Sequence, residues 1–353
     1  MSEEQTPSLR VGLVLDQFAR AGIELQTPML ALELRRAGHC PSLLCLGPLT
    51  EAAVELVAQV EAAGIEVTCL GLTTNPADLA RARRHVRSWS HRGRFDVIYA
   101  AMSGASAVCA SLAHGHRFPS LVIARMSLVD AGRDTRVAAL VRRTAARRAD
   151  AIVANSTAVA VDSSTFEGVG IDRYVVIPNM LPESAFEAVV PAAIETDRPI
   201  VVSVANLRKA KDHRNLLTAL ADLEQGGQAV TAVLVGDGPL RQQIDRHARD
   251  LDLDVRMVGS VDDPRPYLAA ADVFVQSSQT EGSSNSLMEA MAAGCAIVAT
   301  DVGGTAEALR GSGVLVPAKD SAQLADGIRR ILTSPKLARR LRTEARVHAS
   351  TFS

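Results

Sequence analysis

The sequence alternates between short apolar runs and segments with helical spacing, and this alternation most constrains the fold. The apolar run 9–16 is followed by 24–37, where apolar residues recur every three or four positions up to Gly38. Apolar runs of this length, each followed by an amphipathic helix, are typical of buried parallel strands joined by crossover helices. We therefore predict a doubly wound, largely parallel sheet. Its further strands are expected at 41–46, 65–70, 96–101, 120–124, 151–154 and 174–177, and its further helices at 50–63, 76–92, 104–114, 133–148 and 156–168.

The segment 177–199 interrupts this rhythm with four prolines and no consistent period, and a second alternation begins at Ile200. We interpret the interruption as a domain boundary. The α/β chain is thus predicted to form two Rossmann-like doubly wound domains, 1–180 and 199–353, joined by a linker at 181–198. Because ligands of such sheets bind beyond the carboxyl ends of the strands, two facing domains would enclose an interdomain cleft. The second set comprises strands at 200–205, 229–235, 254–258, 272–276, 296–299 and 313–316, and helices at 212–225, 239–251, 265–270, 286–293, 320–333 and 336–348.

The composition disfavours several classes of protein. A net charge of −1 and only 3% aromatic residues disfavour a nucleic-acid partner. The five cysteines are scattered and include no C-x-x-C pair, which indicates a reduced, cytoplasmic protein without structural zinc. The polar N-terminus predicts no signal peptide, and no apolar run approaches the roughly 18 residues of a membrane span.

The stretch 280–304 carries the most distinctive polar pattern. Glu281 and Glu289 stand eight positions apart, with small polar residues between them, and an apolar run comes before. A helix start after such a strand offers unpaired N–H groups and partial positive charge, which suit a phosphate, and Glu289 could accept a bond from a sugar hydroxyl. Taken alone, the stretch is more simply an ordinary capped helix, with Ser286 as N-cap and Glu289 completing a capping box.

Two cations follow another strand of the same predicted sheet. Arg208 and Lys211 come directly after 200–205. An arginine and a lysine at the carboxyl end of a strand suit a diphosphate, while a solvated basic loop is the alternative. Because this loop and the stretch 280–304 belong on one edge of one sheet, they could bind one ligand. Their convergence favours a ligand site over two unrelated surface features.

Three glycine-bearing turns are weaker candidates, since turn geometry alone explains each of them. They are Gly22 with Glu24, the segment 302–305, and the segment 235–239, where Pro239 is expected at the first position of a helix. The chain contains no G-x-G-x-x-G, which disfavours a dinucleotide oxidoreductase. It also contains no H-E-x-x-H or G-x-S-x-G.

The pattern TEGSSNSLMEAMAAGCAIVATDVGG at 280–304 resembles the E-x7-E signature of glycosyltransferase family 4, retaining enzymes of the GT-B fold. The similarity extends along most of the chain, and the combination of segments is highly specific. The other similar segments are AGIELQTPMLALELRRAGH (21–39), RADAIVANS (148–156), VIPNMLPESAF (176–186), SVANLRKAKDHRNLLTAL (203–220), VLVGDGPLR (233–241) and VRMVGSVDDPRPYLAAADVFV (255–275).

The resemblance implies a role for each matching residue. Glu289 would hold the ribose hydroxyls of a nucleotide, and Glu281 would lie beside the transferred sugar. Lys211 would neutralise the diphosphate, while Arg256 and Val258 would flank the base, largely through backbone. The other donor-binding residues that the resemblance implies are Gly22, Glu24, Asn206, Gly282, Ser283, Ser284, Asn285, Ser286 and Leu287.

The chain departs from the family pattern in three places. The usual Gly-Arg pair is Ala205-Asn206 here, so Arg208 is expected to substitute for the missing cation. The glycine after the lysine is Asp212, an anion near a phosphate site. The segment 98–106 lacks the histidine often found after the fourth strand, which leaves the chemistry on the acceptor side open. Family members also usually run on into a helix that crosses back to the first domain, so we expect that helix to be cut short at Ser353.

The resemblance therefore implies a retaining glycosyltransferase that moves a sugar from a nucleoside diphosphate sugar to a hydroxyl acceptor, with no metal or other cofactor. A lipid-linked or polysaccharide acceptor at the inner membrane face is favoured by two arginine-rich helices, 81–94 with Trp89 and 133–148, although a solvated face explains them equally well. The alternatives are a small-metabolite acceptor, as in antibiotic glycosylation, an epimerase or phosphorylase, and a non-catalytic subunit that binds a nucleotide sugar. The base of the donor, uridine, guanosine or adenosine, stays open.

Overall fold

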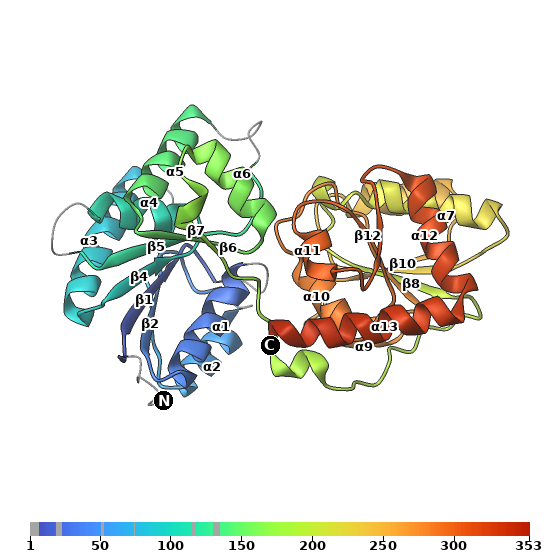
Figure 1. Cartoon of the computed structure of the whole chain (residues 1–353), viewed down its shortest axis with the longest axis horizontal. Coiled ribbons are helices and arrows are strands. Elements are labelled where there is room, and N and C mark those ends of the chain that lie inside the picture. Colours follow the sequence, from blue (N-terminus) through green and yellow to red (C-terminus); the bar gives the residue numbers. More distant parts are fainter. Residues whose placement is uncertain (1–6, 19–22, 51–52, 74, 114–117, 130–134) are drawn as a thin grey trace. The chain divides into compact units, whose positions relative to one another are not determined.

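The computed structural model describes residues 7–18, 23–50, 53–73, 75–113, 118–129 and 135–353 (Figure 1). The chain divides into two compact units, Met1–Pro178 and Asn179–Ser353. Each unit is built on one parallel sheet with helices on both of its faces. The predicted pair of Rossmann-like doubly wound domains is therefore confirmed.

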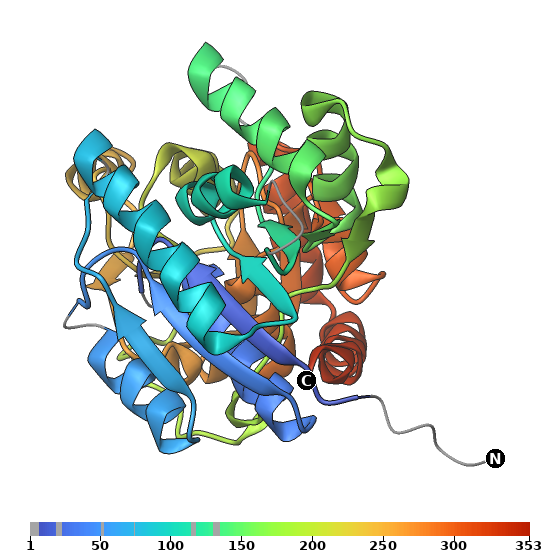
Figure 2. The same cartoon turned by 90° about the vertical axis from the view of Figure 1, so that its left-hand side faces the viewer.

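The N-terminal unit has a seven-stranded parallel sheet in the order β3-β2-β1-β4-β5-β6-β7 (Figure 2). Side chains of α1 and α2 form the core on one face, and those of α3 to α6 form the core on the other. The strands are β1 (Arg10–Leu15), β2 (Cys40–Cys45), β3 (Glu66–Cys69), β4 (Val97–Ala100), β5 (Ser120–Arg125), β6 (Ala151–Ala154) and β7 (Tyr174–Val176). The helices are α1 (Ile23–Arg36), α2 (Val54–Ala62), α3 (Pro76–Gly93), α4 (Ser103–Leu112), α5 (Arg136–Arg148) and α6 (Thr157–Glu167).

The C-terminal unit repeats this plan with a six-stranded parallel sheet in the order β10-β9-β8-β11-β12-β13. Helices α7, α8 and α12 cover one face, while α9, α10 and α11 cover the other. The strands are β8 (Ile200–Val204), β9 (Thr231–Val235), β10 (Val255–Gly259), β11 (Val273–Gln276), β12 (Ile297–Thr300) and β13 (Val314–Val316). The helices are α7 (His213–Gln225), α8 (Arg241–Asp250), α9 (Arg265–Ala269), α10 (Asn285–Ala292), α11 (Thr305–Leu309), α12 (Ser321–Thr333) and α13 (Pro335–Ala349).

The strand order identifies the switch point of each sheet. In the C-terminal unit the chain first adds strands on one side of β8 and then returns to add β11 on the other side. The crevice outside the carboxyl ends of such a strand pair is where doubly wound sheets bind their ligands. The loops that follow β8 and β11 are therefore the favoured place for a site. These loops contain Arg208, Lys211 and Glu281, and Glu289 lies in the helix α10 that follows the second loop.

The segment expected as a linker is part of the C-terminal unit instead. The division falls after Pro178, and the side chains of Leu181 and Ala185 are buried in the core beneath α10. The backbone N–H of Ala192 also donates to the carbonyl of Pro266 at 2.8 Å. Because of its prolines, the sequence of 181–198 shows no helical or strand period, but its apolar side chains still pack on the C-terminal unit.

Two local predictions were wrong. Pro239 lies two positions before α8 rather than at its first residue, because the turn 236–240 hydrogen-bonds to Leu207 and delays the helix. The short helix α11 was not predicted, since the glycine pair before it and its five-residue length show no helical period. Among the described helices, none combines the length and apolar character needed to cross a membrane.

Candidate functional site

The loops after β8 and β11 are bonded to one another at the switch point. The backbone N–H of Gln279 donates to the carbonyl of Ala210 at 2.7 Å, and the Ser277 hydroxyl donates to the carbonyl of Lys211 at 2.9 Å. The structure thus brings the two predicted groups, 208–211 and 281–289, to one edge of one sheet. The two loops meet because β8 and β11 are adjacent strands, and the sequence of neither loop reveals that adjacency.

An ion pair joins these two loops. Nζ of Lys211 lies 2.5 Å from Oε1 of Glu281, and both side chains are largely buried, at 23% and 10% exposed. The Ser278 hydroxyl donates to the same carboxylate oxygen at 2.6 Å. The carboxylate of Glu281 is therefore held from two sides, by Lys211 and by Ser278.

Helix α10 begins beside this pair, and its N-cap is Ser284 rather than the predicted Ser286. The Ser284 hydroxyl accepts a hydrogen bond from the backbone N–H of Leu287 at 3.3 Å. Ser286 lies inside the first turn, with its hydroxyl 3.2 Å from that of Ser284. The capping box was wrong because the helix starts two residues earlier than the spacing of Ser286 and Glu289 suggests.

Asn179 anchors the start of α10, and sequence reasoning did not single it out. Its side-chain amide donates to Oδ1 of Asn285 at 2.6 Å and faces the carbonyl of Ser283 at 3.5 Å. The segment 176–186 was matched to the family without a role for this residue. The position of an asparagine just after the last strand of a domain is the only signal that could have identified it.

Glu289 lies in the second turn of α10 and is part-buried. Burial raises the pKa of its carboxyl to about 7, and the negative charge of Asp263 contributes in the same direction. Within the described part of the chain, no protein side chain donates a hydrogen bond to this carboxyl. A shielded carboxyl without a protein donor is suited to receive hydroxyl groups from a ligand.

Asp212, the anion in place of the family's glycine, has a structural role. Its backbone is left-handed, with φ 47° and ψ 49°, a conformation that glycine adopts freely and aspartate tolerates. Its carboxylate accepts from the backbone N–H of Asn215 at 3.4 Å and from the side-chain amide of Gln279 at 2.8 Å. The charge of Asp212 therefore caps α7.

Arg208 and Asn206 are exposed at the same edge, while Leu207 between them is buried. Leu207 is anchored by the turn 236–240, because its N–H donates to Asp237 and its carbonyl accepts from Leu240. A side chain at Gly238 would place Cβ 2.7 Å from the Leu207 carbonyl, so close packing accounts for this glycine. The candidate segment 235–239 is thus explained as support for the loop that carries Arg208.

The glycine pair at 303–304 also supports the site. The backbone N–H of Gly304 donates to the carbonyl of Gly282 at 3.0 Å, which holds the loop between Glu281 and α10. Gly303 adopts a φ of 53°, in the left-handed region that favours glycine. Gln276 and Thr305 are joined by a side-chain hydrogen bond of 3.3 Å beneath the loop.

Other predicted residues either make contacts elsewhere or lie outside the described residues. Arg256, the second residue of edge strand β10, pairs with Asp254 at 3.3 Å and donates to the carbonyl of Glu195 at 2.9 Å. Val258 on the same strand packs against the core around α10. Gly22 lies outside the described residues, and Glu24 belongs to the first turn of α1, with its side chain outside the description.

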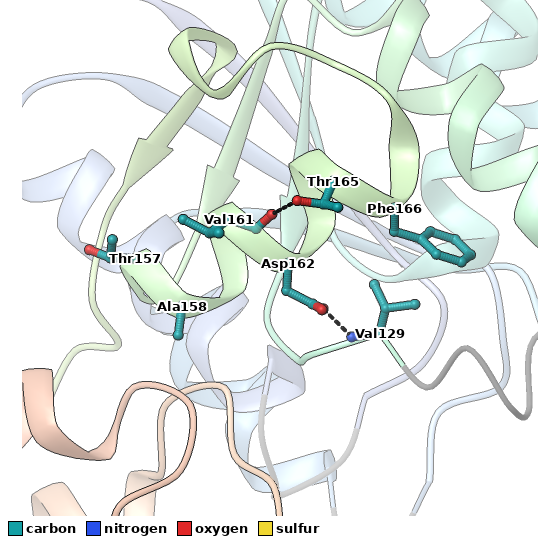
Figure 3. A pocket seen from close by; sticks show the side chains of 7 residues that line it. All are labelled: Val129, Thr157, Ala158, Val161, Asp162, Thr165 and Phe166. Carbon is teal, nitrogen blue, oxygen red and sulfur yellow. Dashed lines mark hydrogen bonds between the residues drawn. The ribbon is translucent and has the colours of Figure 1, made fainter.

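Among the described residues, neither a metal-binding group nor the cavity along α6 coincides with this site. Within the ranges that the structure describes, no group of three or more histidine, cysteine or carboxylate side chains is placed to bind a metal ion. A cavity of about 610 Å³ lies along α6 of the N-terminal unit (Figure 3). None of the residues that line it is a predicted donor-binding residue.

Comparison with known families assigns both units. Residues 21–180 match the glycosyl transferase 4-like domain, and residues 187–348 match the glycosyl transferases group 1 domain. The boundary between the two matches falls close to the division seen in the structure.

Individual relatives are similar over part of their length. The chain is 34% identical over 202 residues to the lipopolysaccharide core biosynthesis glycosyltransferase LpsE of Rhizobium meliloti, which is 55% of this chain and 57% of that protein. It is 31% identical over 157 residues to the N-acetylgalactosamine-N,N'-diacetylbacillosaminyl-diphospho-undecaprenol 4-alpha-N-acetylgalactosaminyltransferase of Campylobacter jejuni, 43% of this chain and 42% of that one. The chain thus spans about half the length of these relatives.

The fold is shared over nearly the whole chain. The crystal structure of Anabaena Alr3699/HepE in complex with UDP superposes with a TM-score of 0.80 at 20% identity, covering 98% of this chain and 95% of that one. TarM superposes with a TM-score of 0.80 at 11% identity, covering 99% and 97%. The two domain matches lead to one assignment: residues 21–180 belong to the glycosyl transferase 4-like family and residues 187–348 to the glycosyl transferases group 1 family, on a two-domain fold shared with these structures.

Proposed function

We propose that this chain transfers a sugar from a nucleoside diphosphate sugar to a hydroxyl acceptor, with retention of configuration at the sugar. The observation that carries the proposal is the Lys211–Glu281 pair beside the start of α10, at the switch point of the C-terminal sheet. A cation, a carboxylate and a helix start at one place suit a diphosphate that is linked to a sugar. Two structures with the same fold are complexes with UDP and with UDP-glucose, which supports a nucleotide donor.

Each group has a part in binding the donor. Glu289 would accept from the ribose hydroxyls, because its carboxyl is part-buried and no described side chain donates a hydrogen bond to it. Glu281 would accept from a hydroxyl of the transferred sugar, and Lys211 and Arg208 would contact the phosphates. Backbone N–H groups in the first turn of α10 would complete the phosphate site.

The chemistry needs stabilisation of a leaving group more than a protein base. The bond between the sugar and the diphosphate breaks, and negative charge develops on the departing phosphate. Lys211, Arg208 and the start of α10 would stabilise that charge in fixed positions, which is often the largest single contribution to catalysis. The departing phosphate would take the proton of the acceptor hydroxyl. No metal or other cofactor is part of this proposal.

For the acceptor we propose a lipid-linked or polysaccharide glycan, reached at the inner face of a membrane. The names of the two relatives described above, a lipopolysaccharide core enzyme and a diphospho-undecaprenol enzyme, support this choice. A small-metabolite acceptor is the second candidate, because the alpha-D-kanosaminyltransferase of Streptomyces kanamyceticus is 28% identical over 155 residues. The orientation of Asp212 toward α7 removes one reason to propose a non-catalytic subunit.

The experiment begins with the donor and proceeds to transfer. Uridine, guanosine and adenosine diphosphates and their sugars are screened by thermal shift, since a ligand at about 100 times its Kd stabilises by about 2.7 kcal/mol. The donor that binds is then incubated with lipid-linked and small-molecule acceptors, with and without EDTA, and the anomeric configuration of the product is read by NMR. Transfer with retention that survives EDTA is expected. An inverted product or an absolute metal requirement would contradict the mechanism, and failure to bind any nucleotide would contradict the function.

A further inference from the structure

The outer side of α5 and α6 exposes apolar side chains that the core does not use. In α5, Val137, Leu140 and Val141 are 71%, 65% and 41% exposed, and Val161 in α6 is 52% exposed. The three residues of α5 are spaced by three and four positions, so they lie on one side of the helix. Figure 1 shows α5 and α6 next to each other in the N-terminal unit.

Arginines accompany this apolar stripe. Arg136, Arg143 and Arg147 are exposed and recur at seven and four positions, which places them on one line along α5 beside Leu140. Helix α5 contains no acidic residue.

Of the two acidic side chains of α6, Asp162 is half-buried and leaves one negative charge near this surface, while Glu167 is withdrawn into the core. Asp162 accepts a bond from the backbone N–H of Val129 at 2.6 Å. Glu167 is fully buried and pairs with Arg125 and Arg142. With three exposed arginines against this one carboxylate, the described part of this side of the unit is apolar with a net positive charge.

An apolar cavity continues the same surface. The cavity of about 610 Å³ runs along α6 and is lined largely by apolar atoms, with Thr157, Asp162 and Thr165 as its polar lining residues beside Val129, Ala158, Val161 and Phe166 (Figure 3). The guanidinium of Arg143 lies 5.4 Å from the centre of the Phe166 ring, so an arginine borders the cavity. We call the combined surface of α5, α6 and this cavity the α5–α6 face.

Helix α3, the other arginine-rich helix, lacks this arrangement. Its Val86 and Trp89 are buried, and the Trp89 ring packs 4.4 Å from that of Phe95. Most apolar side chains of α3 therefore belong to the core, and Leu79 near its start, at 54% exposed, is the exception among its large ones. Of the two helices that the sequence presented as equivalent, α3 exposes one large apolar side chain, Leu79, whereas α5 exposes three on one side together with its arginines.

We propose that the α5–α6 face docks on an anionic lipid bilayer, with its apolar side chains among the upper acyl chains and its arginines at the headgroups. Apolar side chains beside a cationic stripe are the combination by which helices lie in a membrane interface. The docking rests on the proposed function, because its purpose would be to bring the enzyme to a lipid-linked acceptor. Vesicle binding is measured without donor or acceptor, so the docking can fail while transfer stands.

The test is co-sedimentation of the full chain with vesicles. One set contains equal parts of phosphatidylglycerol and phosphatidylcholine, and the other contains phosphatidylcholine alone. We expect binding to the anionic set only, weakening as salt is raised. The triple variant R136Q/R143Q/R147Q should lower the partition coefficient roughly 100-fold, since each arginine near an anionic surface contributes about fivefold. The variant L140S/V141S should lower it at least tenfold at unchanged charge.

The matched control is R84Q/R87Q/R92Q, which removes the same charge from exposed positions of α3. It should bind like the unaltered chain, and circular dichroism checks that all variants are folded. Equal loss of binding in the control would overturn the proposal, because it would show that net charge alone accounts for vesicle binding. Absence of binding to anionic vesicles would also overturn the proposal. So would a dimer that forms without lipid and that L140S/V141S dissociates, since a second copy of the chain would then cover this face.

Discussion

The ammonium group of Lys211 lies 2.5 Å from Oε1 of Glu281, and this ion pair joins the loops that follow β8 and β11. The two residues are 70 positions apart in the sequence. They meet because their strands are neighbours at the switch point of the sheet. A variant of either residue should therefore change both the stability of the protein and its proposed activity, and the two effects can be measured separately.

Lys211→Ala should lower kcat about 100-fold, by analogy with the loss of one preorganised donor to a developing negative charge. It should also lower the free energy of unfolding by about 1–3 kcal/mol, because Glu281 is left part-buried without its cation. Turnover is measured with the donor found by the nucleotide screen, and stability by urea denaturation. Lys209→Ala, at an exposed lysine two positions away, is the control and should change neither quantity.

A double-mutant cycle tests the pair itself. If Lys211 and Glu281 interact directly, the stability lost in Lys211→Ala combined with Glu281→Ala should be less than the sum of the two single losses. Additive losses would show that the pair does not hold in solution. Near-normal turnover in both single variants would refute their proposed part in transfer.

Glu289 should make the protein less stable as pH rises from about 4.5 to about 7. Its pKa is about 7 in the folded state, against 4.5 for an ordinary glutamate. Between these values the unfolded chain has lost the proton while the folded chain retains it, so ionisation favours the unfolded state. At about 1.36 kcal/mol per pKa unit, the upper limit of this loss is about 3 kcal/mol.

The variant Glu289→Gln isolates this effect, because it is neutral at every pH. It should match the unaltered protein in urea denaturation at pH 4 and exceed its stability at pH 8. Parallel stability–pH curves for the two proteins would show that the pKa of Glu289 is not raised.

Nucleotide binding should release protons near pH 7. Ribose hydroxyls that donate to Glu289 favour its ionised form, so affinity should rise with pH through the pKa of about 7. Calorimetry in two buffers of different ionisation enthalpy measures the release. Glu289→Gln should abolish it, whereas an unchanged proton count in that variant would assign the release to another group.

The cap of α10 predicts unequal effects for two neighbouring serines. Ser284→Ala should cost about 1 kcal/mol, because it removes the acceptor of the Leu287 N–H. Ser286→Ala removes no bond to the helix backbone and should cost a few tenths of a kcal/mol at most. Urea denaturation of the two variants gives the ranking, and the reverse order would place the cap at Ser286.

At position 212, glycine should be tolerated better than alanine. The left-handed backbone, with φ 47°, costs a residue with a Cβ about 1–2 kcal/mol, while glycine adopts it freely. Both substitutions lose the cap of α7, so Asp212→Ala should be less stable than Asp212→Gly by about 1 kcal/mol or more. Equal stabilities would indicate that the backbone relaxes at this position.

The sequence by itself determined the two parallel sheets, because apolar runs and helical spacing are local patterns that recur along the chain. The two domains and the strand-end position of Lys211 and Glu281 followed from that alternation. The residues that support the site did not follow from it. Asn179 and Ser278 act through contacts with positions distant in the chain or through loop geometry, and no local pattern distinguishes them.

Only the tertiary structure decided which polar groups are shielded and which apolar groups are exposed. Glu289 differs from an ordinary helix glutamate through its burial, and Leu140 differs from Val86 through its exposure. The same structure moved the cap from Ser286 to Ser284 and packed 181–198 onto the C-terminal unit. Local spacing specifies the type of element and the side on which residues lie. Burial depends on what packs against that side, and those partners come from strands and helices far away in the sequence.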